Sequence, residues 1–319
     1  MDIVLKKTSD LSLDEIEQIC YVFKNVFPGH NKSVNEFNNE FTNTEYGYSY
    51  HILLLSEGVI VGAQSYIPFK YFVSGKKTLF ALSVDTMILE DYRNFDNIFD
   101  LWSIGRKAIK KEGVSFLFGF PNDNSYLLST KGFGDKDVGD LVTYVLPYKV
   151  GSYFTKLKCL NFISKLCCRL LLAFSNFSRN NNEHNYLIKK NRETFDQYRY
   201  KWFDGKYNVV KRNDFSFVYK IINYNGVITA FLMDVYPLTK RNFDSAVRVM
   251  FSRSHTEFEV AIYVGYLHFL PQSMVKVPTK YKPKTFYFVG NILDNSVLDA
   301  DVLFNIQNWE VNLSNYDLL

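Results

Sequence analysis

The sequence predicts an α/β protein of the α+β kind, with a mixed central sheet and flanking helices. Residues 82–119 follow the order strand, basic turn, helix and second strand, and the second strand is apolar throughout, as in an interior strand covered on both faces. Two strand-like runs joined by a short turn precede this stretch, and with its first strand they predict an antiparallel meander of three strands. A similar order of helix, hairpin, helix and strand returns after residue 186, which predicts two lobes of related architecture.

The chain is expected to begin with two helices. Ser12-Leu13-Asp14-Glu15 has the pattern of a capping box, in which the side chains of Ser12 and Glu15 accept helix-start N–H groups. Pro28-Gly29 ends this first helix, and a weaker helix is expected over residues 33–41. The apolar residues that define one face of the first helix are Ile16, Ile19, Cys20, Phe23 and Phe27.

The meander is expected from residue 51 to residue 89. Strands 51–55 and 59–63 meet across Ser56-Glu57-Gly58, the second strand continues to Pro68, and a third strand covers 78–89. The following helix ends at Lys110-Lys111-Glu112-Gly113, where basic residues complement the helix dipole and glycine caps the end. Further strands are expected over 115–120 and 140–146.

Residues 149–182 differ in character from the rest of the chain. Their only charged residues are six lysines and arginines, and leucine and phenylalanine fill much of the space between them. This composition predicts a basic, very apolar helix or helical hairpin. The segment (149–180) either lies on an anionic membrane surface or packs on the lobes as an ordinary core-completing helix.

The second lobe is expected to contain a helix over 193–203 and a hairpin of strands 217–222 and 227–235. Asn225-Gly226 between these strands is a strong hairpin-turn signal. Asn242 is expected to cap a helix that ends near Arg253, and a buried strand covers 260–264. The predicted domain division is 1–148, a linker over 149–185, and 186–319.

Composition excludes several classes of protein. Hydrophobic residues make up 47% of the 319 residues and charged residues 22%, which favours a packed globular chain over a disordered one. The net charge of +4 is too small for a general nucleic-acid binder. The four cysteines and five histidines lack metal-ligand spacing, so no metal is expected. A cytoplasmic location is expected, because neither a signal peptide nor a membrane-spanning run is present.

The order strand, turn, helix and strand over 82–119 predicts a nucleotide-like ligand. A helix that begins directly after a strand offers free backbone N–H groups and the positive end of its dipole to a phosphate. Arg93 adds a cation to the turn. The same pattern also fits a charged loop before a helix with no ligand.

Five stretches of the chain carry a resemblance to a known family. They are Ser83-Val84-Asp85-Thr86-Met87, Asp91-Tyr92-Arg93, Gly119-Phe120-Pro121-Asn122-Asp123-Asn124-Ser125-Tyr126, Gly132-Phe133 and, as a closing strand, Asn308-Trp309-Glu310-Val311-Asn312-Leu313. On these stretches the chain resembles the GNAT superfamily, the GCN5-related N-acetyltransferases. It is most similar to two-lobed members found among cell-surface polysaccharide genes, which are related in shape to the Fem-type aminoacyl transferases. The resemblance covers nearly the whole chain and is strongest between Leu82 and Phe133.

This resemblance implies transfer of an acetyl or other short acyl group from acetyl-CoA or another acyl-CoA to an amine. The amine expected from it is that of an amino sugar or sugar nucleotide in polysaccharide assembly. The acceptor is then a small-molecule or lipid-linked sugar. Two strands that part beyond Leu89 and Phe120 would leave a gap for the thioester. The backbone around Met87 would pair with the pantetheine arm, and the turn beginning at Arg93 would hold the pyrophosphate. The implied donor-binding residues are Met87, Ile88, Leu89, Arg93, Asn94, Phe95, Asp96, Asn97, Ile98, Asn122 and Asn124.

The remaining site residues each have two interpretations. Asp85 is either a proton acceptor that lines the gap or a buried carboxylate that caps a neighbouring turn. Tyr126 either donates a proton to the departing thiolate or packs like most tyrosines. Asn122 and Asn124 either contact the ligand or shape a turn. Tyr66 and Phe69 are expected in the acceptor pocket.

The pyrophosphate loop departs from the family pattern, which has two small residues after the Arg. Asp96 and Ile98 occupy these glycine positions here, although glycine allows a phosphate to approach the backbone closely. This departure leaves two alternatives to acyl transfer. One is a degenerate GNAT-like binding or scaffold protein, and the other is Fem-like aminoacyl transfer from charged tRNA.

Overall fold

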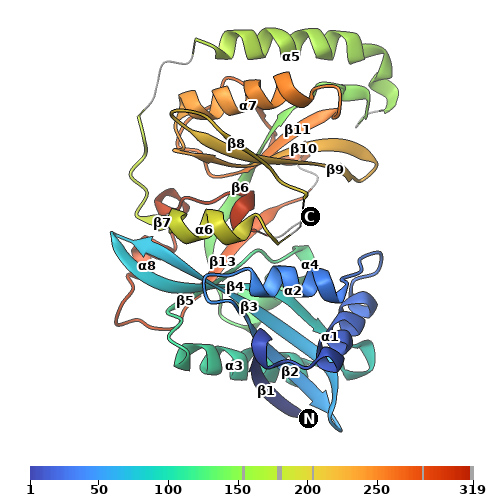
Figure 1. Cartoon of the computed structure of the whole chain (residues 1–319), viewed down its shortest axis with the longest axis vertical. Coiled ribbons are helices and arrows are strands. Elements are labelled where there is room, and N and C mark those ends of the chain that lie inside the picture. The colour runs from blue at the N-terminus through green and yellow to red at the C-terminus, as the bar shows by residue number, and fades with distance from the viewer. Residues whose placement is uncertain (153–154, 178–181, 203–204, 282–283, 317–319) are drawn as a thin grey trace. The chain divides into compact units, whose positions relative to one another are not determined.

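The computed structural model describes residues 1–152, 155–177, 182–202, 205–281 and 284–316 (Figure 1). These residues divide into two compact units that are interleaved along the chain. Unit 1 comprises Met1–Gly139, Leu187–Asp204 and Tyr287–Trp309, and unit 2 comprises Asp140–Tyr186, Gly205–Phe286 and Glu310–Leu319.

Unit 1 is built on a mixed sheet in the order β1-β2-β3-β4-β5-β13. Its neighbours pair antiparallel, except that β4 and β5 run parallel. The short strand β7 extends the sheet by pairing with the far end of β3. The strands span Asp2–Lys7 (β1), Tyr50–Ser56 (β2), Val59–Val73 (β3), Lys76–Ile88 (β4), Phe116–Gly119 (β5), Ile188–Lys190 (β7) and Phe286–Ile292 (β13).

Helices cover both faces of this sheet. Phe37 and Phe41 of α2 contact His51 of β2, whereas Leu101 and Ile109 of α3 share a core cluster with Ile52. Consecutive strand residues point to opposite faces, so α2 and α3 pack on opposite sides. The helices of unit 1 span Leu13–Val26 (α1), Val34–Thr42 (α2), Phe95–Lys111 (α3), Asp123–Leu127 (α4), Arg192–Arg199 (α6) and Ala300–Leu303 (α8).

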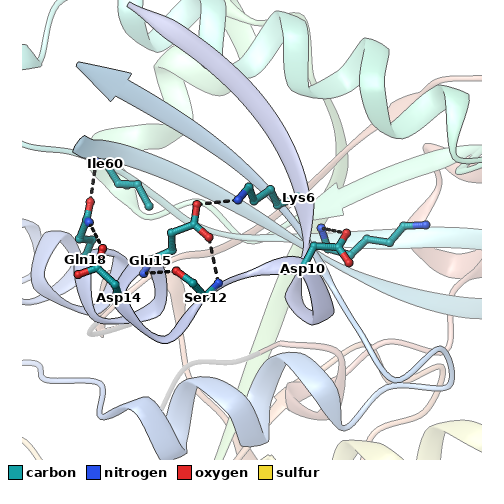
Figure 2. A network of polar contacts seen from close by, with 8 residues as sticks. Lys6, Asp10, Ser12, Asp14, Glu15, Gln18 and Ile60 are labelled. Carbon is teal, nitrogen blue, oxygen red and sulfur yellow. Dashed lines mark hydrogen bonds and ion pairs between the residues drawn. The ribbon is translucent and has the colours of Figure 1, made fainter. Parts of the chain in front are cut away.

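The capping box that the sequence predicts at the start of α1 is present (Figure 2). Ser12 Oγ accepts from the N–H of Glu15, and Glu15 Oε2 accepts from the N–H of Ser12. Lys6 Nζ donates to the other oxygen of Glu15 at 2.7 Å, and this bond is the main cause that lowers the pKa of Glu15. Gln18 Oε1 accepts from the N–H of Ile60, which attaches the first helix to β3.

Unit 2 contains a second mixed sheet, in the order β6-β11-β10-β9-β8. Strands β10 and β11 are parallel, and β9 and β10 form the predicted hairpin. Asn225 and Gly226 both have positive φ there. The elements span Lys136–Leu146 (β6), Asn208–Lys211 (β8), Ser216–Tyr224 (β9), Val227–Tyr236 (β10), Val260–Gly265 (β11), Val275–Lys276 (β12, on β6), Asn161–Ser175 (α5) and Lys240–Ser254 (α7).

Several local expectations differ from the structure. Thr239, not Asn242, caps α7, and its side chain accepts from the N–H of Asn242. The stretch from Asn308 to Leu313 is not a closing strand. It contains two isolated bridges, from Trp309 to Ile188 and from Asn312 to Gly265, between 3₁₀ turns.

The interleaved units also differ from the division at 148 and 185. β7 and α6 belong to unit 1 because β7 pairs with β3, and Phe195 and Trp202 pack on Phe69. β13 joins unit 1 because it pairs with β5. These pairings connect residues more than a hundred positions apart, and local sequence patterns do not specify them.

Candidate active site

The parallel strands β4 and β5 part partway along their length. Their pairing covers Phe80–Leu82 against Phe116–Phe118, whereas β4 continues to Ile88 and remains paired with β3. The residues of β4 from Ser83 to Thr86 are partly or fully exposed, although those just before them are buried. β5 itself ends at Gly119, so the edge of β4 beyond Leu82 has no described strand partner on that side. We call this edge, with the end of β5, the wedge, and the thioester gap that the resemblance implies would lie there.

A β-bulge lies at this wedge. Val84 pairs with Ser65 and Met87 with Ala63, so Asp85 and Thr86 together oppose the single residue between them on β3. Asp85 has φ +50°, and aspartate is among the few residues that adopt this left-handed conformation readily. Bulges redirect side chains, and they occur often beside active sites.

The redirected Asp85 carboxylate forms an ion pair with Lys32. Lys32 lies between α1 and α2, and its Nζ is 2.5 Å from Asp85 Oδ2 and 2.6 Å from Glu40 Oε2. The lysine side chain is 11% exposed, Glu40 is 1% exposed, and Asp85 retains 18%. Two carboxyl groups thus share one ammonium, and Asp85 is the more accessible of the two.

Electrostatics and ring contacts stabilise the charged form of this lysine. Burial by itself lowers the pKa of Lys32, but the carboxylates of Asp85 and Glu40 outweigh burial and raise the pKa above its usual value. The ammonium also lies over the rings of Phe23 and Phe41, at 4.7 and 5.0 Å. Lys32 is therefore a fixed cation in this site.

Cys20 of α1 lies close enough to interact electrostatically with Lys32 and Asp85. Burial raises the pKa of its thiol to about 11. The thiolate is the reactive form of cysteine, so this rise in the pKa favours the less reactive thiol at neutral pH.

On the edge of β4 that faces the wedge, the carbonyl oxygen of Ile88 already accepts hydrogen bonds from a side chain of the protein. Leu89 N–H donates to Val61 O on β3, and backbone groups alternate in direction along a strand. The backbone groups of Ile88 therefore point away from β3. Arg93 donates Nε and Nη2 to Ile88 O, at 3.1 and 2.9 Å. Its guanidinium thus binds the end of β4, and among the described residues the N–H of Ile88 has no acceptor outside the sheet.

The predicted pyrophosphate turn is the N-terminus of α3. The Asn94 side chain caps the helix by accepting from Asn97 N–H, and Ile98 N–H donates to Asn94 O. Among the described residues, the N–H groups of Phe95 and Asp96 have no acceptor. These two donors and the helix dipole are what the turn offers an anion.

Two side chains of β3 each keep a buried polar atom without a hydrogen-bond partner among the described residues. Gln64, the residue opposite the bulge, donates from Nε2 to Ser83 Oγ at 3.1 Å. Its Oε1 and the hydroxyl of Tyr66 are buried without a hydrogen-bond partner among the described residues. Buried polar groups are almost always hydrogen-bonded, so Gln64 Oε1 is a candidate acceptor for a ligand donor.

Other predicted site residues have local structural roles. Asn122 caps α4 and accepts from the N–H groups of Asn124 and Ser125. Asn124 is exposed. The hydroxyl of Tyr126 donates to Asp137 at 2.7 Å, and its ring stacks on Tyr287 of β13, which lies on the side of β5 away from β4.

The two residues expected in the acceptor pocket lie in the core of unit 1. Tyr66 is 1% exposed and belongs to the cluster beneath α3, where burial raises its pKa. Phe69 is 8% exposed and packs on Phe195 and Trp202. In the described structure neither side chain opens onto the surface of the wedge.

Sequence reasoning missed three residues of this site, namely Lys32, Glu40 and Gln64. Lys32 and Glu40 approach Asp85 only through the packing of α1 and α2 on the sheet, and no spacing in the sequence connects them. The strand pattern of the sequence places Gln64 within the meander. Its position opposite Asp85 and Thr86 depends on the bulge in β4, which no local pattern predicts. Among the described residues, no group of three or more metal-ligating side chains comes together.

Comparison with solved structures identifies the fold. The chain is similar to a GCN5-related N-acetyltransferase from Anabaena variabilis, with 10% identity, a TM-score of 0.57, and coverage of 91% of this chain and 73% of that one. It is also similar to a protein of unknown function from Enterococcus faecalis described as a probable N-acyltransferase, with 12% identity, a TM-score of 0.58, and coverage of 92% and 73%.

Eis1 from Mycobacterium abscessus is a further structural neighbour, with 11% identity, a TM-score of 0.52, and coverage of 92% and 74%. The chain has a GNAT fold. The alignments cover 91–92% of this chain and therefore include parts of both unit 1 and unit 2. No family model and no curated protein matches the sequence.

Proposed function

We propose that this GNAT-fold protein is an N-acyltransferase that moves an acetyl or other short acyl group from acyl-CoA to an amine. The parting of β4 and β5 after Leu82 and Phe118 carries the proposal, because it exposes a strand edge in the middle of a sheet. The N–H of Ile88, the N–H groups at the start of α3 and the orphan oxygen of Gln64 are the groups that would hold the donor.

Acyl-CoA supplies an activated acyl group as a thioester. In the proposed reaction the amine nitrogen bonds to the acyl carbon, the carbon–sulfur bond breaks, and the thiolate leaves. Asp85 takes the proton released by the amine, directly or through water. Lys32 holds the Asp85 carboxylate at the wedge. Tyr126, whose hydroxyl is engaged by Asp137, remains a proposed proton donor to the thiolate.

For the acceptor we propose the amine of an amino sugar or sugar nucleotide, free or lipid-linked, used in surface polysaccharide assembly. The resemblance between Leu82 and Phe133 supports this choice. A panel of amino-sugar nucleotides, free amino sugars and peptide amines, with release of free thiol as the readout, tests it. Thiol release with peptide amines alone would contradict the sugar assignment and leave acyl transfer intact.

Calorimetry with acetyl-CoA tests the donor site directly. A Cβ at Gly119 would lie at the start of the wedge, 3.5 Å from Ser83 O and 3.7 Å from Ser83 Cβ. These are ordinary contacts, so we expect Gly119→Ala to bind and Gly119→Leu, which fills the gap, to lose binding. Failure of the parent chain to bind at millimolar ligand would remove the proposal.

A second candidate function is a binding or scaffold protein on a degenerate GNAT frame. The N-terminus of α3 favours it, because Asn94 satisfies the N–H of Asn97 and Asp96 adds a negative charge to the first turn. If Asp96→Gly creates acetyl-CoA affinity that the parent lacks, the parent site is degenerate. Equal affinity of the two proteins would instead support a working donor site. Fem-like transfer from charged tRNA remains the third alternative, and the net charge of +4 gives it little support.

A further inference from the structure

Helix α5 of unit 2 is apolar on the face that it presents to solvent. Its buried side consists of Cys168, Leu172 and Ser175, and it packs against α7. The opposite side follows the spacing i, i+3, i+7 and i+11 of one helical face. The residues of this exposed face, with the flanking Phe162 and Phe177, are Phe162 (76% exposed), Ile163 (54%), Leu166 (51%), Leu170 (50%), Phe174 (67%) and Phe177 (72%).

The segment 149–182, which includes α5, carries only positive charges. Residues 149–182 contain six of the 37 lysines and arginines and none of the 33 aspartates and glutamates, so the rest of the chain has slightly more acidic than basic residues. Lys158 and Arg169 are exposed. No described ion pair involves Lys158, Lys165 or Arg169, whereas Lys149 pairs with Glu259.

A hollow of about 490 Å³ between α5 and α7 lies beside this face. Arg169 and Arg248 both line it, and no described carboxylate lies within ion-pair distance of either residue. Arg248 is anchored by bonds to Ser175 O and Ser245 Oγ, at 2.7 and 2.8 Å. The lining residues are Arg169, Leu172, Ala173, Asn176, Arg248 and Phe251.

We infer that the α5 face is a docking surface for an anionic phospholipid membrane. Its apolar side chains would enter the interface, the basic side chains would face the headgroups, and the two arginines of the hollow would contact a lipid phosphate. Charge complementarity selects this occupant, because an apolar face in a segment whose own charges are all positive fits a membrane surface that is negatively charged. No described helix is long and apolar enough to cross a membrane.

Flotation of the full chain with phosphatidylcholine vesicles, with and without phosphatidylglycerol, tests the inference. We expect binding only to the anionic vesicles and weaker binding as salt rises. One basic residue near the surface contributes about fivefold to the partition coefficient. Replacing Lys158, Lys165 and Arg169 together by Gln should therefore reduce binding about a hundredfold.

The apolar contribution has a matched control. Leu166→Ser and Phe174→Ser should each reduce anionic-vesicle binding about tenfold. Leu270→Ser removes a side chain that is 71% exposed in unit 2 outside α5, and it should leave binding unchanged. Circular dichroism checks that all three variants remain folded.

Three results would overturn the inference. These are no binding to anionic vesicles, equal binding to neutral and anionic vesicles, and a dimer in light scattering that Leu166→Ser and Phe174→Ser dissociate. The last result would make the face an interface between copies of this chain. None of these readouts depends on acyl transfer, so the membrane inference and the proposed activity fail separately.

Discussion

Asp85 combines three unusual properties in one residue. It has positive φ within a strand, it lies where β4 leaves β5, and it pairs with a buried lysine. The structure gives the Asp85 carboxylate a specific partner, Lys32, and its role as a proton acceptor stays a prediction. Its conformation is compatible with asparagine, which makes a conservative test possible.

Asp85→Asn should reduce kcat/KM by about a hundredfold or more, because positioned proton acceptors typically contribute that much. Initial rates of thiol release at one fixed pH measure this effect. Asp100→Asn, an exposed carboxylate on α3, is the control, and undiminished activity of Asp85→Asn would exclude the assigned role.

His51 provides a second prediction at this scale, concerning stability. It is fully buried, with Thr8 Oγ1 and Ser65 Oγ each 2.9 Å from one ring nitrogen, and burial lowers its pKa to about 3. The neutral ring is favoured in the folded state, so its contribution to stability is present above the unfolded pKa of about 6.5 and is lost as pH falls towards 3.

Between pH 6.5 and pH 3 only the unfolded state binds a proton at His51, so the free energy of unfolding should fall by about 1.4 kcal/mol per pH unit. Urea denaturation at several pH values measures this slope. His51→Gln cannot titrate and should show a shallower slope between pH 6 and pH 4. Identical slopes in the two proteins would show that other groups cause the acid sensitivity.

Among the elements, α1 follows the local rules of capping and periodicity, whereas β4 departs from the regular strand pattern. α1 obeys them, since its capping box, its apolar face and its C-terminus at Pro28-Gly29 agree with the structure. β4 breaks them at its bulge, and the deviation lies in the candidate site. Local irregularities of this kind concentrate where function requires an unusual geometry.

The cap of α1 gives a prediction at the scale of the element. Ser12→Ala removes the acceptor for Glu15 N–H and should lower the free energy of unfolding by about 1 kcal/mol. Urea denaturation at neutral pH is the measurement. Ser103→Ala, within α3, should have little or no destabilising effect because alanine is the best helix former. A smaller loss for Ser12→Ala than for Ser103→Ala would contradict the capping argument.

At the scale of the whole molecule, unit 1 is assembled from three separate stretches of chain. Trp309 is fully buried there and lies within about 6 Å of the rings of Tyr71, Phe80 and Phe116. β13 pairs with β5, and β7 pairs with β3. The N-terminal 148 residues therefore lack part of the core of the unit to which most of them belong.

A fragment ending at residue 148 should not unfold cooperatively, because it lacks β7, α6, β13 and Trp309. Urea denaturation monitored by circular dichroism tests this, with the full chain under the same conditions as the reference. A sharp transition of the fragment would favour the contiguous domain division that the sequence predicts.

The sequence by itself determined the elements whose signals are local. These include the capping box, the hairpin at Asn225-Gly226 and the apolar strand β5. The resemblance of the chain to a known family sufficed for the GNAT fold. Only the tertiary structure decided that β7 and β13 join unit 1, that Arg93 binds Ile88 O, and that Lys32 and Glu40 meet Asp85. The physical reason is range, because propensity, capping and periodicity act within a few residues, whereas strand pairing and ion pairs depend on segments that only folding brings together.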